Sequence, residues 1–255
     1  MKLIAVLITI VLLMPMLAEA EAEAEAESVV LHTAEAPVID GRGDDPAWQQ
    51  AQWRPMPYLI TGSMPSAEDF SGRFKLLWDK DYLYLQAEIT DDVLYDAYPD
   101  PLKQYWDDDA LEIFIDSDAS GGGHQYNHSA FAYHIALDNQ AVDLGDNRQP
   151  RLYNEHLQSR WQRSAEAPHV IIWEVAIRLY PDDYRDDQPN RPLLLDAGRR
   201  IGFMLAYCDN DGSAEREHFV GSVDIEPVEG DRNRGWIDAS VFETMILAPS
   251  ANNTK

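Results

Sequence analysis

Basic residues are scarce in this 255-residue chain, where 20 Lys and Arg stand against 45 Asp and Glu and give a formal net charge of −25 at pH 7. Nucleic acids and anionic membrane surfaces attract proteins through clusters of basic side chains, because binding displaces their counterions. A chain this acidic gains nothing from such contacts. We therefore expect neither nucleic acid nor a membrane as a partner. Neutral ligands and cations such as Ca²⁺ are compatible with this charge.

Cysteine is almost absent as well, since Cys208 is the single one in the sequence. One cysteine excludes an internal disulfide, so the fold is not a small scaffold held by cystines. We expect Cys208 to be a small buried apolar residue. Hydrophobic residues make up 45% of the chain, which supplies a buried core and excludes wholesale disorder.

Long hydrophobic runs are limited to residues 3–17, which follow Lys2 and precede Ala18-Glu19-Ala20. A basic start, an apolar stretch and a small-x-small site predict a secretory signal, and the stretch is shorter than the roughly 20 residues that span a bilayer. Glu and Ala alternate over residues 21–27, where repelling like charges predict a solvated linker. We expect a secreted or periplasmic protein with a signal peptide (1–20), a linker (21–28) and a single domain (29–255).

Helical periodicity is missing from the predicted domain, and strand periodicity takes its place. Apolar residues alternate with other residues over 83–89, 111–115, 133–137, 171–177 and 201–207. This alternation predicts strands with one buried face. Polar stretches such as 117–125, 143–149 and 181–192 predict long loops. We expect an all-β fold, a single antiparallel β-sandwich of the jelly-roll or immunoglobulin-like kind.

Two local turns are also predicted. The segment from Arg73 to Trp78 is joined to Tyr82 by Asp79-Lys80-Asp81, which favours a hairpin. Asp45-Pro46 favours a short helical turn, with Asp45 as the cap and Pro46 at the first helical position.

The strand alternation also gives polar side chains a direction. If Leu111, Ile113 and Ile115 point into the core, Glu112 points out of the same sheet, and the same pattern turns His134 outward on a neighbouring strand. An aromatic plate beside such hydrogen-bonding groups suits a sugar ring. These residues also fit a simpler interpretation, in which they lie on the sheet surface.

Several segments resemble family 9 carbohydrate-binding modules. The longest is Trp106–Asp116 (WDDDALEIFID), which is similar to the family's run of Trp, an acid, a small residue and Glu-Ile-Phe-Ile-Asp. Shorter similarities occur, in the family's order, over 37–48, 75–85, 173–177 and 201–211. The resemblance covers the chain from Pro37 to Leu247.

This resemblance implies a Ca²⁺-associated β-sandwich that binds sugar units between two tryptophans. It implies that Trp106 is one aromatic wall and that Glu112 accepts a hydrogen bond from a sugar hydroxyl. The family's arginine on the next strand falls at His134, where a titratable ring replaces a permanent cation.

The second aromatic wall does not follow the family pattern. It is expected near Ser222, and no tryptophan stands there. Phe219 and Trp236 are the substitutes that the sequence offers, and neither is placed opposite Trp106 by the sequence alone.

The loop from Asp209 to Glu217 completes the predicted ligand site, with Arg216 and Glu217 as ligand-binding residues beside Trp106, Glu112 and His134. The same loop has acidic spacing that suits calcium but lacks the final glutamate of an EF-hand. The predicted Ca²⁺ ligands are Asp209, Asp211, Asp40 and Asp91.

No catalytic signature stands out in the sequence, which lacks G-x-S-x-G and a Gly-rich phosphate loop. Since the resembling module is non-catalytic, we expect a carbohydrate-binding protein for a neutral oligo- or polysaccharide rather than an enzyme. One alternative is an accessory part of a glycoside hydrolase system, with a separate glycosidase as partner. The other is a haem-binding periplasmic electron-transfer domain with axial ligands among Met64, Met204, His134 and His218.

Overall fold

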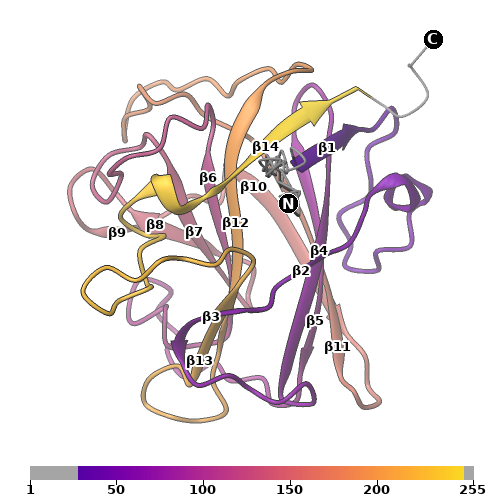
Figure 1. Ribbon diagram of the computed structural model, residues 1–255, viewed down its shortest axis with the longest axis vertical. Helices are drawn as coiled ribbons and strands as arrows, with labels where there is room; N and C mark the ends of the chain where they lie inside the picture. The colour runs from indigo at the N-terminus through magenta and orange to yellow at the C-terminus, as the bar shows by residue number, and fades with distance from the viewer. Residues whose placement is uncertain (1–27, 250–255) are drawn as a thin grey trace, which may run out of the picture.

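The computed structural model describes residues 28–249, whose strands form two facing layers (Figure 1). The strands are β1 (Ser28–His32), β2 (Arg54–Pro55), β3 (Tyr58–Gly62), β4 (Phe70–Trp78), β5 (Leu83–Asp91), β6 (Ala110–Asp116), β7 (Phe131–Ala136), β8 (Ala141–Leu144), β9 (Pro150–Leu152), β10 (Leu157–Arg163), β11 (Val170–Ile177), β12 (Arg200–Asp209), β13 (His218–Gly221) and β14 (Glu243–Ala248). Two 3₁₀ helices, η1 (Pro46–Gln50) and η2 (Ala239–Val241), complete the elements.

The predicted signal peptide and most of the predicted linker lie outside the described residues and stay predictions; Ser28, the last linker residue, begins β1. Within residues 28–249, no helix has the length and apolar character that crossing a membrane requires.

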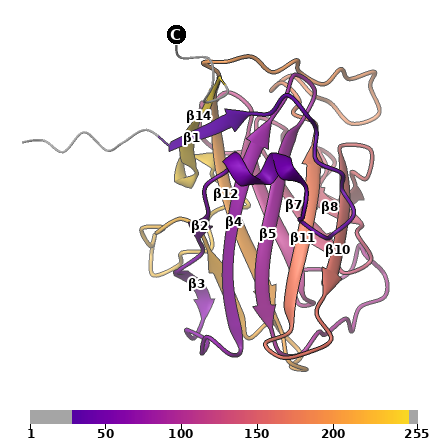
Figure 2. The same ribbon diagram turned by 90° about the vertical axis from the view of Figure 1, so that its right-hand side faces the viewer.

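The two layers are joined at one end, so the hydrogen-bonded path is continuous. One layer has the order β10-β11-β5-β4, which Figure 2 shows side by side, and the other has the order β14-β12-β6-β7-β8-β9. The link is β1, which pairs in parallel with both β4 and β14. The predicted β-sandwich is confirmed, with one difference: the sheet is mixed rather than purely antiparallel because of β1.

The main core fills the space between the layers and consists of the residues that the alternation turned inward. Leu85 and Ile89 from one layer and Ile113, Ile135 and Phe203 from the other are fully buried in it. The strand directions predicted from the sequence are therefore confirmed.

The outer face of the second layer is not open, contrary to the expectation of a solvated sheet surface. Phe114, Met204 and Cys208 lie on this face and form a second buried cluster with Ile225 and Phe242. These last two come from the chain between β13 and β14, which therefore covers part of the sheet. Cys208 is buried, as predicted.

The outer face of the first layer is crossed by the chain around η1 (Figure 2). Trp48 on η1 is 1% exposed and packs with Leu77, Tyr84 and Ala176. This segment belongs to the stretch 37–48 that resembles the carbohydrate-binding family, and its tryptophan serves the packing of the fold.

A buried carboxylate on β11 holds this segment in place. Glu174 is fully buried, and its Oε1 accepts a hydrogen bond of 2.8 Å from Trp48 Nε1. Its Oε2 accepts bonds from the backbone amides of Gly41, at 2.8 Å, and Asp40, at 3.3 Å. The Glu174 side chain therefore accepts hydrogen bonds from three donors of this segment, and buried donors require such acceptors.

The two predicted turns are present, one with different capping. The Asp79 amide donates to the Tyr82 carbonyl between β4 and β5, which confirms the hairpin. The helical turn begins at Pro46 as predicted, but Asp45 makes no side-chain cap. Its carboxylate instead accepts a hydrogen bond of 3.1 Å from the Val38 amide.

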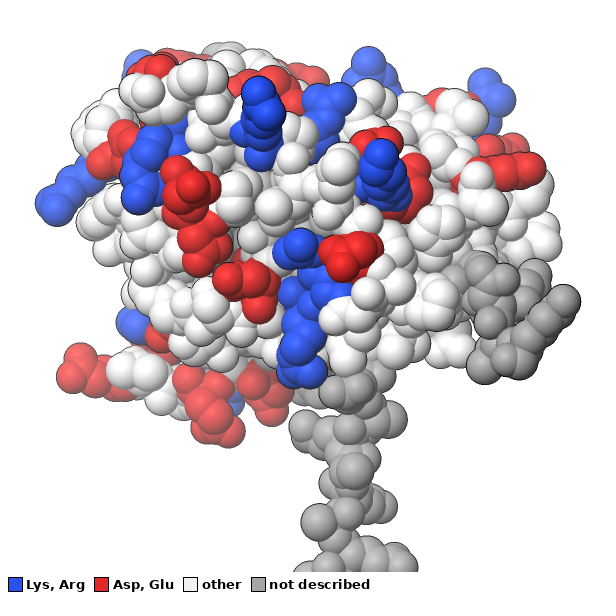
Figure 3. Space-filling model, turned by 90° about the horizontal axis from the view of Figure 1, so that it is seen from above, with Lys and Arg blue, Asp and Glu red and all other residues white. Residues whose placement is uncertain are grey.

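Charge on the surface is mixed on the end seen from above. There, Lys and Arg side chains alternate with Asp and Glu side chains (Figure 3). The acidic excess of the sequence therefore does not form a continuous patch on the described residues visible at this end.

We predict that Glu174→Ala lowers the free energy of unfolding by about 3 kcal/mol, because three donors lose a charged acceptor in a buried site. Urea unfolding measures this. The control is Glu88→Ala on the adjacent β5, which removes the ion pair with half-exposed Arg73 and is expected to cost less than about 1 kcal/mol. Equal costs for the two variants would contradict the anchoring role of Glu174.

Candidate functional site

The chain between β13 and β14 (222–242) is called the covering segment below. Beside it, a pocket of about 420 Å³ opens on the outer face of the second layer. It is lined by Tyr105, Trp106, Glu112, Ala132, His134, Asp143, Leu144, Pro150, Arg216, Asn233 and Trp236. Four of the five predicted ligand-binding residues are in this set. The lining residues come from the four neighbouring strands β6, β7, β8 and β9 and from loops that are distant in sequence, so only the fold brings them together.

Two tryptophans with large exposed areas line the pocket. Trp106 is 43% exposed and Trp236 is 37% exposed, although most large apolar side chains are buried. The other substitute wall, Phe219, is 1% exposed and lies under the Arg216 guanidinium, 4.0 Å from it. Trp236 is thus the second exposed aromatic residue of the pocket.

The loop that carries Trp236 lies directly on the sheet because Gly235 has no side chain. A Cβ on Gly235 would be 2.5 Å from Met204 Cε and 2.9 Å from Phe114 Cε1. The Gly235 carbonyl accepts a hydrogen bond of 2.8 Å from Nε2 of buried His124. A glycine and a histidine in separate loops therefore fix the position of Trp236, and no pattern in the sequence connected them.

The loop that carries Trp106 is held by the acidic residues that follow it. The Asp108 carboxylate accepts hydrogen bonds from the Ala97 and Tyr98 amides, and Asp109 accepts one from Tyr95. These aspartates thus serve the folding of the loop.

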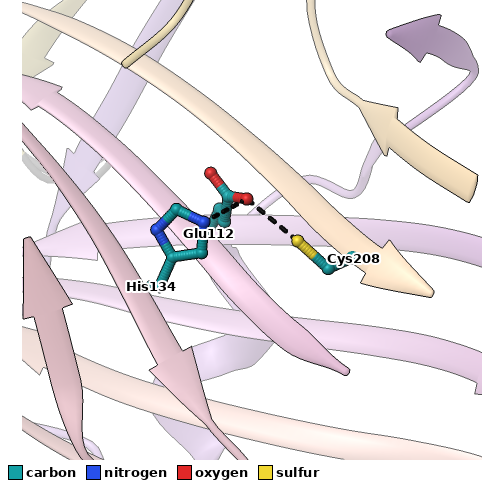
Figure 4. A group of neighbouring side chains, drawn as sticks. All are labelled: Glu112, His134 and Cys208. Carbon is teal, nitrogen blue, oxygen red and sulfur yellow. Dashed lines mark hydrogen bonds and ion pairs between the residues drawn. The ribbon is translucent and has the colours of Figure 1, made fainter. Parts of the chain in front are cut away.

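Glu112 forms the floor of the pocket and is opposite His134 in the register of β6 and β7. Its Oε1 lies 2.6 Å from His134 Nε2, 3.0 Å from Arg216 Nη1 and 2.9 Å from the Cys208 sulfur (Figure 4). All three contacts converge on Oε1. The second oxygen, Oε2, takes part in none of them and is available to a ligand.

The charge of Glu112 is stabilised by its cationic neighbours. Burial alone would raise the pKa of this carboxyl, but His134 and Arg216 outweigh burial and hold the pKa below its usual value. Burial and the adjacent Glu112 raise the pKa of the Cys208 thiol well above its ordinary range. Cys208 therefore stays protonated and donates its S–H to Glu112.

Glu112, His134 and Cys208 are close enough together to hold a metal ion, because their ligand atoms lie within 4.8 Å of one another. Arg216 Nη1 lies 3.0 Å from Glu112 Oε1 and 2.9 Å from the Cys208 sulfur. A permanent guanidinium thus already supplies the positive charge. This group is better suited to bind a polar ligand than a metal.

Two predicted features differ in the structure. Glu112 and His134 point out of the sheet as predicted, but they are only 2% and 8% exposed because the covering segment lies beside them. Glu217 does not line the pocket, and its carboxylate accepts a hydrogen bond from Ser213 Oγ. The Asp209–Glu217 loop thus contributes Arg216 to the pocket.

Six lining residues were not singled out from the sequence, and three of them have polar side chains: Tyr105, Asp143 and Asn233. The edge of the Tyr105 ring contacts both Trp106 and His134, with centroid distances of 5.0 and 4.8 Å. Asp143 lies on β8, although the sequence predicted a polar loop there. In the sequence, the position of Tyr105 next to Trp106 was the one feature that could have indicated it as a site residue; no sequence feature indicated Asp143 or Asn233.

A separate acidic cluster lies where β5 and β12 end and β6 begins. Carboxylate oxygens of buried Asp91, Asp109 and Asp209 lie within 4.8 Å of one another, and Asp69, Asp92 and Asp211 form a second such group. Three of the four predicted metal ligands, Asp91, Asp209 and Asp211, are therefore in these two groups. Asp40 is not, because it lies against β11 and pairs with Arg42 at 3.5 Å.

The buried carboxyls of this cluster are hard to ionise. Burial, aided by the neighbouring carboxyls, raises the pKa of Asp91 to about 6, of Asp209 to about 8 and of Asp109 to about 9. Among residues 28–249, Asp91 Oδ1 finds no hydrogen-bond partner although Asp91 is fully buried.

Residues 39–249 match the family described as Carbohydrate family 9 binding domain-like. Among solved structures, a family 9 carbohydrate-binding module from Caldicellulosiruptor kristjanssonii in complex with cellotriose has a TM-score of 0.64 at 20% identity, covering 90% of this chain and 97% of that one. The same module in complex with glucose has a TM-score of 0.63 at 20% identity, covering 89% and 100%. At this identity the two structures show a shared fold.

Curated relatives are carbohydrate-active enzymes that match over a small part of their length. Exoglucanase XynX of Acetivibrio thermocellus is 29% identical over 83% of this chain and 16% of its own length. Endo-1,4-beta-xylanase A of Thermotoga maritima is 31% identical over 37% of this chain and 8% of its own. The chain thus spans a small fraction of each of these enzymes.

We predict that Gly235→Ala displaces the Trp236 loop and lowers the free energy of unfolding by about 1–3 kcal/mol, because fully buried Met204 and Phe114 leave no space for a methyl group. Urea unfolding measures the change. As the control, Gly123→Ala places its Cβ 3.7 Å from the Ile237 carbonyl, an ordinary contact, and is expected to change stability by less than about 0.5 kcal/mol. An unchanged Gly235→Ala variant would show that the loop is not fixed by this close approach.

Proposed function

Because this chain belongs to the carbohydrate family 9 binding domain-like family, we propose that it binds a neutral oligo- or polysaccharide in the pocket between Trp106 and Trp236. The observation that carries the proposal is the combination of two exposed tryptophans with a buried carboxylate that has one free oxygen. Aromatic faces pack against the C–H face of a sugar ring, and the polar floor receives its hydroxyls.

Each polar group of the floor has a role in this proposal. Glu112 Oε2 accepts a hydrogen bond from a sugar hydroxyl, and its three contacts through Oε1 keep it oriented. Arg216 and His134 supply donors, and both His134 ring nitrogens lack an aligned hydrogen bond within the described residues. Since these groups are already held by one another, little conformational entropy is lost on binding.

The proposed role is binding without catalysis. A glycosidase needs one carboxylate as base or nucleophile and a second carboxyl as acid. The lowered pKa of Glu112 makes it a weak base, because the neighbouring cations stabilise its charge. The names of the curated relatives support a place beside a glycosidase, and the signal-like residues 1–20 support secretion.

We predict a dissociation constant on the order of 10–1,000 μM for a cello-oligosaccharide, as expected for one aromatic clamp and few hydrogen bonds. Trp106→Ala and Trp236→Ala should each abolish binding in calorimetry and leave the melting temperature nearly unchanged, because both side chains are partly exposed and lie outside the buried core clusters.

The control for these variants is Tyr58→Ala, an exposed aromatic residue outside the pocket, which should bind like the wild type. If the tryptophan variants unfold, these residues are structural anchors. If they fold and still bind, the sugar lies elsewhere.

We also propose that Ca²⁺ occupies the acidic cluster of Asp91, Asp109 and Asp209. The unpartnered Asp91 Oδ1 fits this ion, since a buried carboxylate oxygen needs a partner and oxygen ligands are those that Ca²⁺ prefers. Asp109 also accepts a hydrogen bond from Asn210, whose side-chain amide donates to the Asp107 carbonyl. A bound cation would thus stabilise the loops that carry Trp106 and Arg216.

We predict that EDTA lowers the melting temperature by about 5–10 °C and that Ca²⁺ restores it. The effect should be larger at pH 8 than at pH 5. A carboxyl whose folded pKa lies above its unfolded value near 3.9 keeps a proton that the unfolded chain releases, so stability without the cation falls as pH rises from about 4 to about 9. Identical melting curves in EDTA and Ca²⁺ would dismiss the calcium site.

A further inference from the structure

Asp143 is a second carboxyl in the pocket, and its environment differs from that of Glu112. It lies on β8, and its oxygens accept one backbone amide each, from Ala132 at 2.8 Å and from Leu144 at 2.7 Å. Within residues 28–249 it forms no ion pair. Each oxygen therefore keeps a free acceptor position in a pocket that is lined by aromatic rings.

No cation neutralises Asp143, although one lies nearby in the sheet. Arg151 is opposite Asp143 in the register of β8 and β9, but its guanidinium pairs with Asp187 at 2.8 Å and lies 3.7 Å from Asp186. His134 and Arg216 both contact Glu112. These basic side chains are thus already in contact with other carboxylates.

The neighbouring charges that most affect the pKa of Asp143 are those of two carboxylates. Burial raises the pKa of Asp143 to about 8, and the charges of Glu112 on β6 and Asp186 after β11 add to the increase. Three phenols, Tyr105, Tyr133 and Tyr153, also interact with its charge. The empty pocket therefore favours a protonated Asp143, and a cationic ligand group beside it would favour the ionised form.

We propose that the pocket selects a sugar that carries a protonated amino group, with Asp143 as the acceptor of the ammonium. This inference rests on the proposed function, since it uses the same sugar-binding pocket, and it adds a positively charged amino sugar as a ligand preferred over the neutral ones. The free acceptor positions of Asp143 receive the N–H donors in charge-assisted hydrogen bonds. The faces of Trp106 and Trp236 attract the same cation, as aromatic rings do.

Binding of such a ligand is linked to a proton. At about pH 6 the sugar amine is charged and Asp143 is protonated, so formation of the ammonium–carboxylate pair releases the Asp143 proton to the buffer. A neutral sugar forms no such pair and releases no proton. Proton release thus reports on Asp143 in the wild-type protein, without any substitution.

The test is calorimetry of the full chain with three oligosaccharides of equal length: glucosamine, N-acetylglucosamine and cello-oligomers. We expect the glucosamine oligomer to bind at least about tenfold more tightly than the other two. Titration in buffers of different ionisation enthalpy should show release of about one proton for the glucosamine oligomer and none for the neutral ones.

Asp143→Asn should remove both the preference and the proton release while neutral sugars still bind. Asp146→Asn is the matched control, since it removes the same charge from an exposed residue after β8 and should behave like the wild type. Equal affinity for the glucosamine and cello-oligomers, without proton release, would overturn this inference and leave the proposed function intact. Failure of all three oligosaccharides to bind would overturn both.

Discussion

Burial of carboxylates along one segment is the constraint on which the rest of this structure depends. Asp107, Asp108, Asp109, Glu112 and Asp116 are all at most 6% exposed. A buried carboxylate is costly unless it is hydrogen-bonded or paired, so each of these side chains determines where another part of the chain must lie. The loop before β6, the end of β12 and the floor of the pocket all follow from this requirement.

The buried carboxylates of this protein differ in how far their hydrogen-bonding capacity is satisfied. Those that the chain satisfies fully stabilise the fold, whereas those that it satisfies in part are the ones proposed to bind a ligand. Glu174 is fully satisfied by donors of its own chain and holds the η1 segment on the sheet. Glu112 is paired through one oxygen and keeps the other for a ligand. The carboxylates of Asp143, Asp91, Asp109 and Asp209 form no ion pair within the described residues, which is why a ligand amine and Ca²⁺ are the proposed partners.

The covering segment between β13 and β14 converts a sheet face into a pocket. Without it, Glu112 and His134 would be solvated and their contacts weakened by water. The segment lies close to the sheet because Gly235 permits the approach, and it brings Trp236 to the site. The resemblance to the family implies an aromatic wall near Ser222, and the exposed tryptophan that lines this pocket instead comes from position 236.

The sequence by itself determined the strands, their inward faces and the outward direction of Glu112 and His134, because alternation with a period of two depends only on local geometry. It also identified the family, through the run from Trp106 to Asp116. The tertiary structure alone decided that Trp236 rather than Phe219 lines the pocket, that Asp40 is separate from the acidic cluster, and that Asp143 joins the site. These outcomes depend on how loops distant in sequence pack on the sheet, and that packing follows from buried contacts that no local pattern encodes.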